Sequence, residues 1–131
     1  MSFHDLTDES RSRMSAAVMR TYPNIVRDWQ LHPVDAARLL GVSVETYRRW
    51  SELPEQALLD RHHLERMSLI LGIYQALQVL LPSNDAADSW LHRPNNHPMF
   101  GGQPPWKRLK SGHIADLYDV RKFLEAKLQR W

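Results

Sequence analysis

The chain has 131 residues and no cysteine, so disulfide bonds and thiolate metal sites are excluded. Its formal net charge is only +2, from 17 Lys and Arg against 15 Asp and Glu, and its length suits one domain or two small ones. The charged stretch 2–13 does not resemble a secretory leader and the longest apolar stretch, 69–81, is too short to span a bilayer, so we expect a cytoplasmic protein without a membrane partner.

Two helices are predicted in the first thirty residues. The first begins at a cap formed by Asp8 or Ser10 and runs to about Met19. Pro23 predicts a break, because a proline disfavours the helical conformation in the residue before it. A second, short helix is expected over residues 24–30.

The next two helices are short and are joined by a tight turn. Pro33 suits the first position of a helix over 33–40, and Gly41 can end that helix in the left-handed conformation. Ser43 is a preferred N-cap for a helix over 44–50. This layout is that of a helix-turn-helix, in which the second helix enters the DNA major groove.

The second of these helices has an inward and an outward face. Tyr47 and Trp50 lie three residues apart, share one face and are expected to point inward. The residues then placed to contact DNA are Ser43, Val44, Glu45, Thr46, Arg48 and Arg49. An ordinary helical hairpin with solvated arginines is the alternative interpretation. Residues 1–52 hold seven Arg and seven Asp or Glu, and this balance fits a dimer that supplies two copies, weak DNA binding, or none.

The longest predicted helix spans residues 57–81. Its second half, 69–81, is apolar nearly all round, which predicts burial on all sides. A short helix then begins at Ser83 or Asn84 and runs through Leu91.

Residues 92–105 predict a loop, because they contain four Pro, two Gly and two Asn. Long loops of this kind are often functional. A short helix over 106–109 and a last helix over 113–129 follow, and the last helix has an apolar seam of Leu117, Val120, Leu124, Leu128 and Trp131. The predicted fold is all-α, an N-terminal helix-turn-helix bundle followed by a small helical domain, with about eight helical segments.

No catalytic or metal site is predicted. His62 and His63 are adjacent, so on a helix they point about 100° apart. No Ser has a persuasive base at a known spacing, and no glycine-rich loop follows a strand. Asp116 and Asp119 are expected to be favoured by the dipole at the start of the last helix. We therefore expect no catalytic residue, metal or cofactor, and no enzyme activity.

Several short motifs occur in order before the last helix: Trp90-Leu91-His92-Arg93-Pro94-Asn95, Phe100-Gly101-Gly102-Gln103-Pro104-Pro105 and Leu109-Lys110-Ser111-Gly112. Together they resemble the toxin-binding domain of the Xre/MbcA/ParS antitoxins, over about residues 57–131. Residues 7–56 resemble the Xre-type helix-turn-helix of the same family. One departure is the extra proline at Pro105.

The resemblance implies an antitoxin of a type II toxin–antitoxin system, with residues 1–56 as the helix-turn-helix domain and 57–131 as the toxin-binding domain. It implies a RES-domain toxin as partner, a class that consumes or modifies NAD. The C-terminal domain would block the toxin's active site, the protein would form a homodimer, and the helix-turn-helix would bind double-stranded operator DNA to repress its own operon.

The residues expected to contact the toxin are Pro94, Asn95, Gly101, Gly102, Pro104, Trp106, Lys107, Arg108, Arg121, Lys122, Arg130 and Trp131. Without the resemblance, we would favour a loop that packs on the long helix, tryptophans that belong to the core and lysines on a solvated face. Two other functions stay open: a stand-alone helix-turn-helix regulator whose C-terminal half serves dimerisation, and a structural adaptor that no longer binds DNA.

Overall fold

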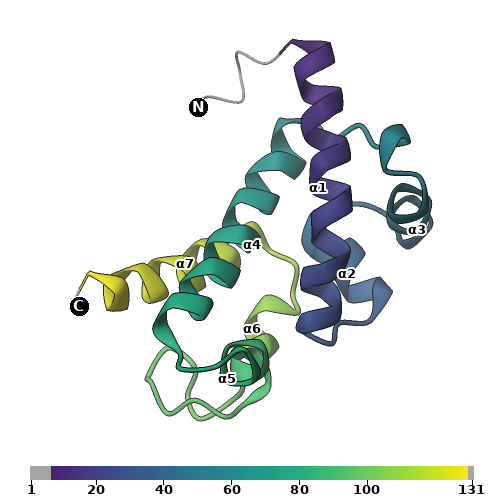
Figure 1. Ribbon diagram of the computed structural model, residues 1–131. Helices are drawn as coiled ribbons and strands as arrows, with labels where there is room; N and C mark the ends of the chain where they lie inside the picture. Colours follow the sequence, from purple (N-terminus) through teal and green to yellow (C-terminus); the bar gives the residue numbers. More distant parts are fainter. Residues whose placement is uncertain (1–6, 130–131) are drawn as a thin grey trace. The chain divides into compact units, whose positions relative to one another are not determined.

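The computed structural model describes residues 7–129, and within them it contains α-helices and short 3-10 helices but no strand. The predicted all-α class is therefore confirmed. Figure 1 shows the helices: α1 (Asp8–Asp28), α2 (Pro33–Leu40), α3 (Val44–Glu52), η2 (Pro54–Gln56), α4 (Arg61–Leu80), α5 (Asn84–Ser89), η3 (Trp90–His92), α6 (Trp106–Leu109) and α7 (Ile114–Leu128). None of the helices in this part of the chain is long and apolar enough to cross a membrane.

The chain divides into two compact units, and the division falls inside α4. The N-terminal unit is Met1–Ser68 and the C-terminal unit is Leu69–Trp131. Buried apolar side chains of the first include Met19, Tyr22, Trp29, Leu39, Leu40, Leu59 and Met67. Those of the second include Ile70, Ile73, Leu77, Leu91, Leu109, Leu117 and Val120.

Helix α1 runs without interruption through Pro23, so the predicted break and separate second helix are wrong. Proline removes one backbone donor from a helix. Its helical neighbours Tyr22 and Ile25 are fully or almost fully buried, and their burial favours the continuous helix over a break. The N-cap is Thr7 rather than either predicted residue, and its hydroxyl accepts a hydrogen bond from the N–H of Ser10.

Helices α2 and α3 are the predicted pair. Helix α2 begins at Pro33, and Gly41 follows it with a φ of +86°, the left-handed conformation that favours glycine. Ser43 caps α3, because its hydroxyl accepts a 3.1 Å hydrogen bond from the N–H of Thr46. These local signals place both helices where the sequence predicted them, although α3 extends two residues further, to Glu52.

The inner face of α3 packs on α1. Tyr47 and Trp50 are buried, as their spacing predicted. The ring of Tyr47 meets the ring of Tyr22 edge-on, with centroids 5.9 Å apart. The hydroxyl of Tyr22 also donates a 2.8 Å hydrogen bond to the carbonyl of Ala36 in α2. One side chain of α1 therefore contacts both helices of the pair.

The helix predicted from residue 57 begins instead at Arg61, so the first predicted turn is wrong. The N–H of Leu59 donates a 2.8 Å hydrogen bond to the hydroxyl of Ser15, which is fully buried in α1. The same hydroxyl donates to the carbonyl of Arg11 at 2.7 Å. This contact between distant parts of the chain holds the segment before α4 in an extended conformation.

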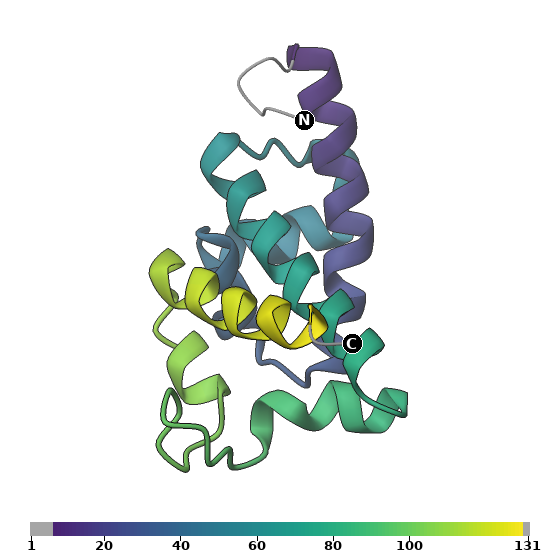
Figure 2. The same ribbon diagram turned by 90° about the vertical axis from the view of Figure 1, so that its left-hand side faces the viewer.

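In the C-terminal unit, the second half of α4 packs with α7, which Figure 2 shows in yellow as it crosses the teal helix. The prediction that this half of α4 is buried on all sides is wrong for one strip. Val79 is 68% exposed. Gln75, four residues before it, is also exposed, and so is Ser68, seven residues before Gln75. Residues at these spacings share one helix face, so α4 keeps a narrow outer face within the described chain.

Helix α7 has the predicted seam. Leu117, Val120 and Leu124 are buried, and Leu128 is half-buried. The last predicted member, Trp131, lies outside the described residues.

Candidate functional site

The predicted DNA-contacting residues lie on the cap and the outer side of α3. Ser43, Glu45, Arg48 and Arg49 are exposed, whereas Val44 and Thr46 are half-buried. The hydroxyl of Ser43 also donates to that of Thr46 at 3.0 Å, so these two polar groups serve the helix cap. Within residues 7–129, neither Arg48 nor Arg49 has an ion-pair partner in the chain. Their contact with DNA stays a prediction.

The turn between α2 and α3 rests against a side chain that the sequence pattern did not predict. Arg66 of α4 donates a 3.2 Å hydrogen bond to the carbonyl of Leu39, near the end of α2. A β-carbon at Gly41 would lie 3.2 Å from the side chain of Arg66. Burial lowers the pKa of the Arg66 guanidinium. From the sequence, the start of α4 is seen to be charged, but nothing there indicates that Arg66 contacts the turn between α2 and α3.

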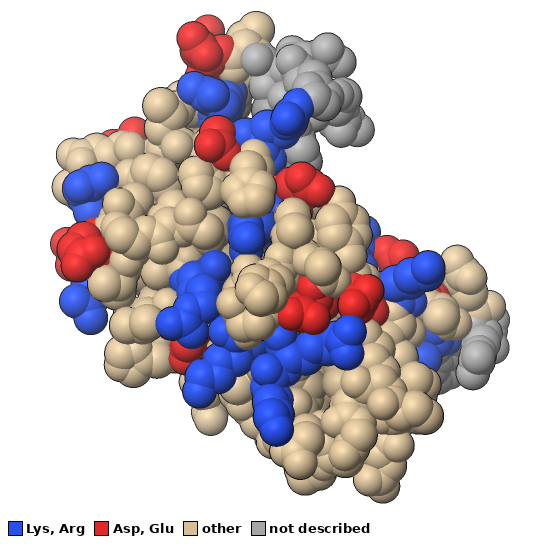
Figure 3. Space-filling model, turned by 180° about the vertical axis from the view of Figure 1, so that it is seen from behind, with Lys and Arg blue, Asp and Glu red and all other residues tan. Residues whose placement is uncertain are grey.

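Charges of both signs are mixed on the surface, and Figure 3 shows Lys and Arg side chains interspersed with Asp and Glu on the face that it displays. In the N-terminal unit, Arg13 lies 2.9 Å from Glu9 and Arg38 lies 3.6 Å from Asp35. These pairs neutralise part of the arginine charge. The arginines on the outer side of α3 are unpaired in the described chain, so they carry the positive charge available there.

In the C-terminal unit, backbone hydrogen bonds close the predicted loop on itself. The N–H of Asn95 donates to the carbonyl of Gln103 at 3.2 Å, and the N–H of Gly102 donates to the carbonyl of Asn95 at 2.9 Å. The side-chain oxygen of Asn95 accepts a 3.0 Å hydrogen bond from the N–H of His97. At the tip, Gly101 and Gly102 are exposed and have φ values of +58° and +84°.

Arg108 connects this loop to α7. Its Nη1 donates to the carbonyl of Met99 at 3.2 Å, its Nη2 donates to Asp119 at 2.8 Å, and its Nε lies 3.2 Å from a carboxylate oxygen of Asp116. The helix dipole was the expected partner of both carboxylates, but each is within ion-pair distance of Arg108. The guanidinium of Arg108 is thus engaged inside the unit.

The other predicted toxin-contacting residues have different surroundings. Pro94, Lys107 and Lys122 are exposed, Pro104 and Trp106 are half-buried, and Arg130 and Trp131 lie outside the described residues. Arg121 is half-buried, and its Nε donates to Glu125 at 2.8 Å. A shallow hollow of about 240 Å³ is lined by Met99, Phe100, Gln103, Pro104, Lys107 and Arg108. It brings three of the predicted residues together.

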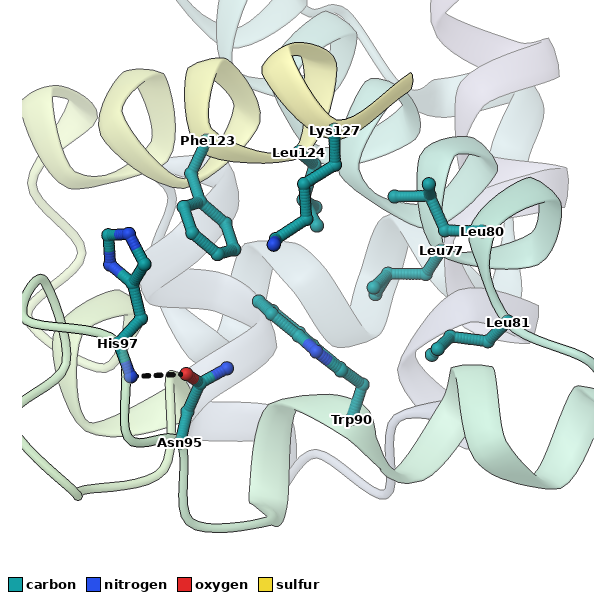
Figure 4. Close-up of a pocket in the computed structure, with 9 residues that line it drawn as sticks. All are labelled: Leu77, Leu80, Leu81, Trp90, Asn95, His97, Phe123, Leu124 and Lys127. Carbon is teal, nitrogen blue, oxygen red and sulfur yellow. Dashed lines mark hydrogen bonds between the residues drawn. The ribbon is translucent and has the colours of Figure 1, made fainter. Parts of the chain in front are cut away.

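A larger pocket, of about 330 Å³, opens in the C-terminal unit (Figure 4). Its lining residues are Leu77, Leu80, Leu81, Trp90, Asn95, His97, Phe123, Leu124 and Lys127. The rings of Trp90 and Phe123 are stacked, with centroids 6.2 Å apart, and Phe100 meets each of them edge-on. The ammonium of Lys127 lies 4.9 Å from the centre of the Phe123 ring.

Of the pocket residues, Asn95 alone was among the predicted toxin-contacting residues. The i, i+4 spacing of Phe123 and Lys127 on α7 was the available signal, because such residues are neighbours on a helix surface. The sequence could not show that Trp90, 33 positions earlier, stacks on Phe123. Among residues 7–129, no group of three or more His, Asp or Glu side chains is placed to hold a metal ion.

The two units match two known domain families. Residues 8–72 match the antitoxin Xre-like helix-turn-helix domain, and residues 76–127 match the antitoxin Xre/MbcA/ParS C-terminal toxin-binding domain. Over 118 residues, the chain is 31% identical to the uncharacterized protein y4oB of Sinorhizobium fredii (strain NBRC 101917 / NGR234). The aligned region covers 89% of this chain and 88% of that protein. The chain therefore belongs to the Xre/MbcA/ParS family of antitoxins of toxin–antitoxin systems.

Proposed function

We propose that this antitoxin neutralises a RES-domain toxin, which consumes or modifies NAD, by covering the toxin's active site with residues 57–131. The observation that carries this proposal is the loop before α6, which is closed by its own hydrogen bonds and presents exposed residues such as Pro94 and Gly102. A loop already ordered in the free protein loses less conformational entropy when it docks. Neutralisation of this kind requires binding and no catalytic residue.

We further propose that residues 1–56 bind the operator of the same operon through α3. Arg48 and Arg49, which have no ion-pair partner among residues 7–129, are the side chains that support this role. Since residues 1–52 carry as many acidic as basic residues, a homodimer with two copies of α3 would bind DNA more tightly than one copy. We therefore propose that the DNA-binding form is a homodimer.

Co-expression with the open reading frame beside this gene tests the first proposal. We expect the neighbouring protein alone to stop growth and to deplete cellular NAD, and we expect this chain to restore both and to co-purify with it. A toxic neighbour that leaves NAD unchanged would exclude the RES class. A neighbour that is harmless and does not bind would favour the stand-alone regulator, whose C-terminal half serves dimerisation.

Operator binding tests the second proposal. Arg48→Ala and Arg49→Ala should each weaken binding, and loss of a phosphate contact should lower the slope of log K against log salt by roughly one unit. Arg20→Ala is the matched control, because Arg20 is an exposed arginine of α1 outside the helix pair. Unchanged binding in both α3 variants would show that α3 is not the recognition helix.

A further inference from the structure

We infer that the pocket beneath the Trp90 and Phe123 rings is the docking site for an apolar side chain of the toxin that is flanked by a carboxylate. This inference rests on the proposed toxin partner and names the part of the toxin that the C-terminal unit recognises.

The walls of the pocket are apolar, and their side chains pack against one another. Four leucines line it beside the stacked rings of Trp90 and Phe123 (Figure 4). A volume of about 330 Å³ is at the lower end of the range for ligand pockets, roughly 300–1,000 Å³. This space suits one large apolar side chain, and the rings need little rearrangement to receive it.

The polar side chains that line the pocket each supply a hydrogen-bond donor: Trp90 through its indole N–H, and Asn95, His97 and Lys127 through nitrogen groups. The side-chain oxygen of Asn95 accepts from the N–H of His97, so its amide NH₂ remains on the pocket side (Figure 4). The Nδ1 of His97 accepts from the N–H of Met99, so the proton of the neutral ring is on Nε2. The charged donor among them is the ammonium of Lys127. Within residues 7–129 it contacts the Phe123 ring and has no carboxylate partner.

A pocket with an apolar interior and several side-chain donors around it favours an occupant that is apolar and carries an acceptor. A carboxylate beside an apolar side chain meets this requirement, because hydrogen bonds between an ammonium and a carboxylate are stronger than neutral ones. A second copy of this chain is a poorer occupant. Residues 104–131 hold seven Lys or Arg against three Asp or Glu, so two such segments would repel one another.

The test uses the full-length protein and the toxin encoded beside its gene, in a form inactivated in its active site. Lys127→Glu reverses the charge at the pocket without altering the core, and Leu81→Trp places a larger side chain at its edge. Calorimetric titration should show each variant binding the toxin about tenfold more weakly or worse. Arg20→Glu is the matched control, because it makes the same charge change at an exposed cation of α1 that lies outside the pocket and outside the residues proposed to cover the toxin. Its affinity should stay within about twofold of the wild type.

A charge swap then identifies the partner group. Replacing the toxin's acidic residues one at a time with lysine should yield one variant that binds Lys127→Glu better than it binds the wild type. Circular dichroism and operator binding of each antitoxin variant show whether the fold is retained.

Three results separate the possibilities. Wild-type affinity in both pocket variants overturns this inference and leaves the proposed function intact. A wild-type chain that does not bind the toxin overturns the proposed function itself. Pocket variants that change from dimer to monomer in sedimentation, with unchanged toxin affinity, assign the pocket to a second copy of the chain and overturn the inference.

Discussion

The Ser15→Ala substitution removes the hydroxyl that accepts a 2.8 Å hydrogen bond from the N–H of Leu59. Ser15 is fully buried, so no water can replace the lost acceptor. A buried donor left unpaired costs about 1–3 kcal/mol. Alanine is a better helix former than serine by roughly 0.5 kcal/mol, which offsets part of this cost in α1. We therefore expect the free energy of unfolding to fall by about 1–2 kcal/mol.

Urea denaturation followed by circular dichroism measures this loss. Ser12→Ala is the matched control, because Ser12 is exposed on the same helix and gains the helix propensity without losing a buried hydrogen bond. It should be as stable as the wild type or slightly more stable. Amide exchange at Leu59 gives a second measurement, slow in the wild type and faster in Ser15→Ala. Equal urea midpoints for the two variants, with Leu59 exchange unchanged, would refute the reasoning.

Three further predictions concern pH, the turn and the loop. Burial, with a smaller contribution from Tyr47, raises the pKa of Tyr22 well above 10.0 in the folded protein. The folded state therefore favours the neutral phenol, and the free energy of unfolding that depends on it is fully present below about pH 10 and is lost as pH rises through the folded-state pKa. The urea midpoint of the wild type should fall in this range, and that of Tyr22→Phe should fall less. Gly41→Ala should cost about 1–2 kcal/mol because of its left-handed φ, and Gly41→Asn should cost less; equal losses would contradict this cause. Arg108→Ala should cost about 1 kcal/mol, since its side chain is 35% exposed, and should speed amide exchange at Gly102; unchanged exchange would show that Arg108 does not hold the loop.

The helix-turn-helix could be predicted from the sequence because its boundaries depend on local chemistry. Pro33 at a first helical position, Gly41 in the left-handed conformation and Ser43 as a cap each act within a few residues of where they stand. The same holds for the loop before α6, whose prolines and glycines exclude regular structure. The short helix Trp106–Leu109 was also predicted with its observed bounds.

The features that the sequence did not predict depend on partners far along the chain. The extended segment before α4 exists because Ser15 accepts a hydrogen bond from Leu59, 44 residues later. Pro23 stays inside α1 because its neighbours are buried by other elements, and local propensity alone favours a break. In the candidate toxin-contacting region, the partners of Arg108 and the stacking on Phe123 likewise form only when the chain folds.

The backbone at the tip of the loop before α6 has a conformation that favours D-amino acids over L-amino acids. Gly101 and Gly102 both have positive φ, yet a β-carbon at either position would meet no other atom within 4 Å. Glycine is therefore needed there for the direction in which the backbone turns, and the surrounding space would accept a side chain. A D-amino acid has the opposite conformational preference from an L-amino acid, so D-alanine introduced at Gly102 by chemical synthesis should fit the turn. It should also lower the conformational entropy of the unfolded chain and so stabilise the fold. The tip can adopt this shape because glycine, which has no chiral centre, takes up positive φ without a steric penalty.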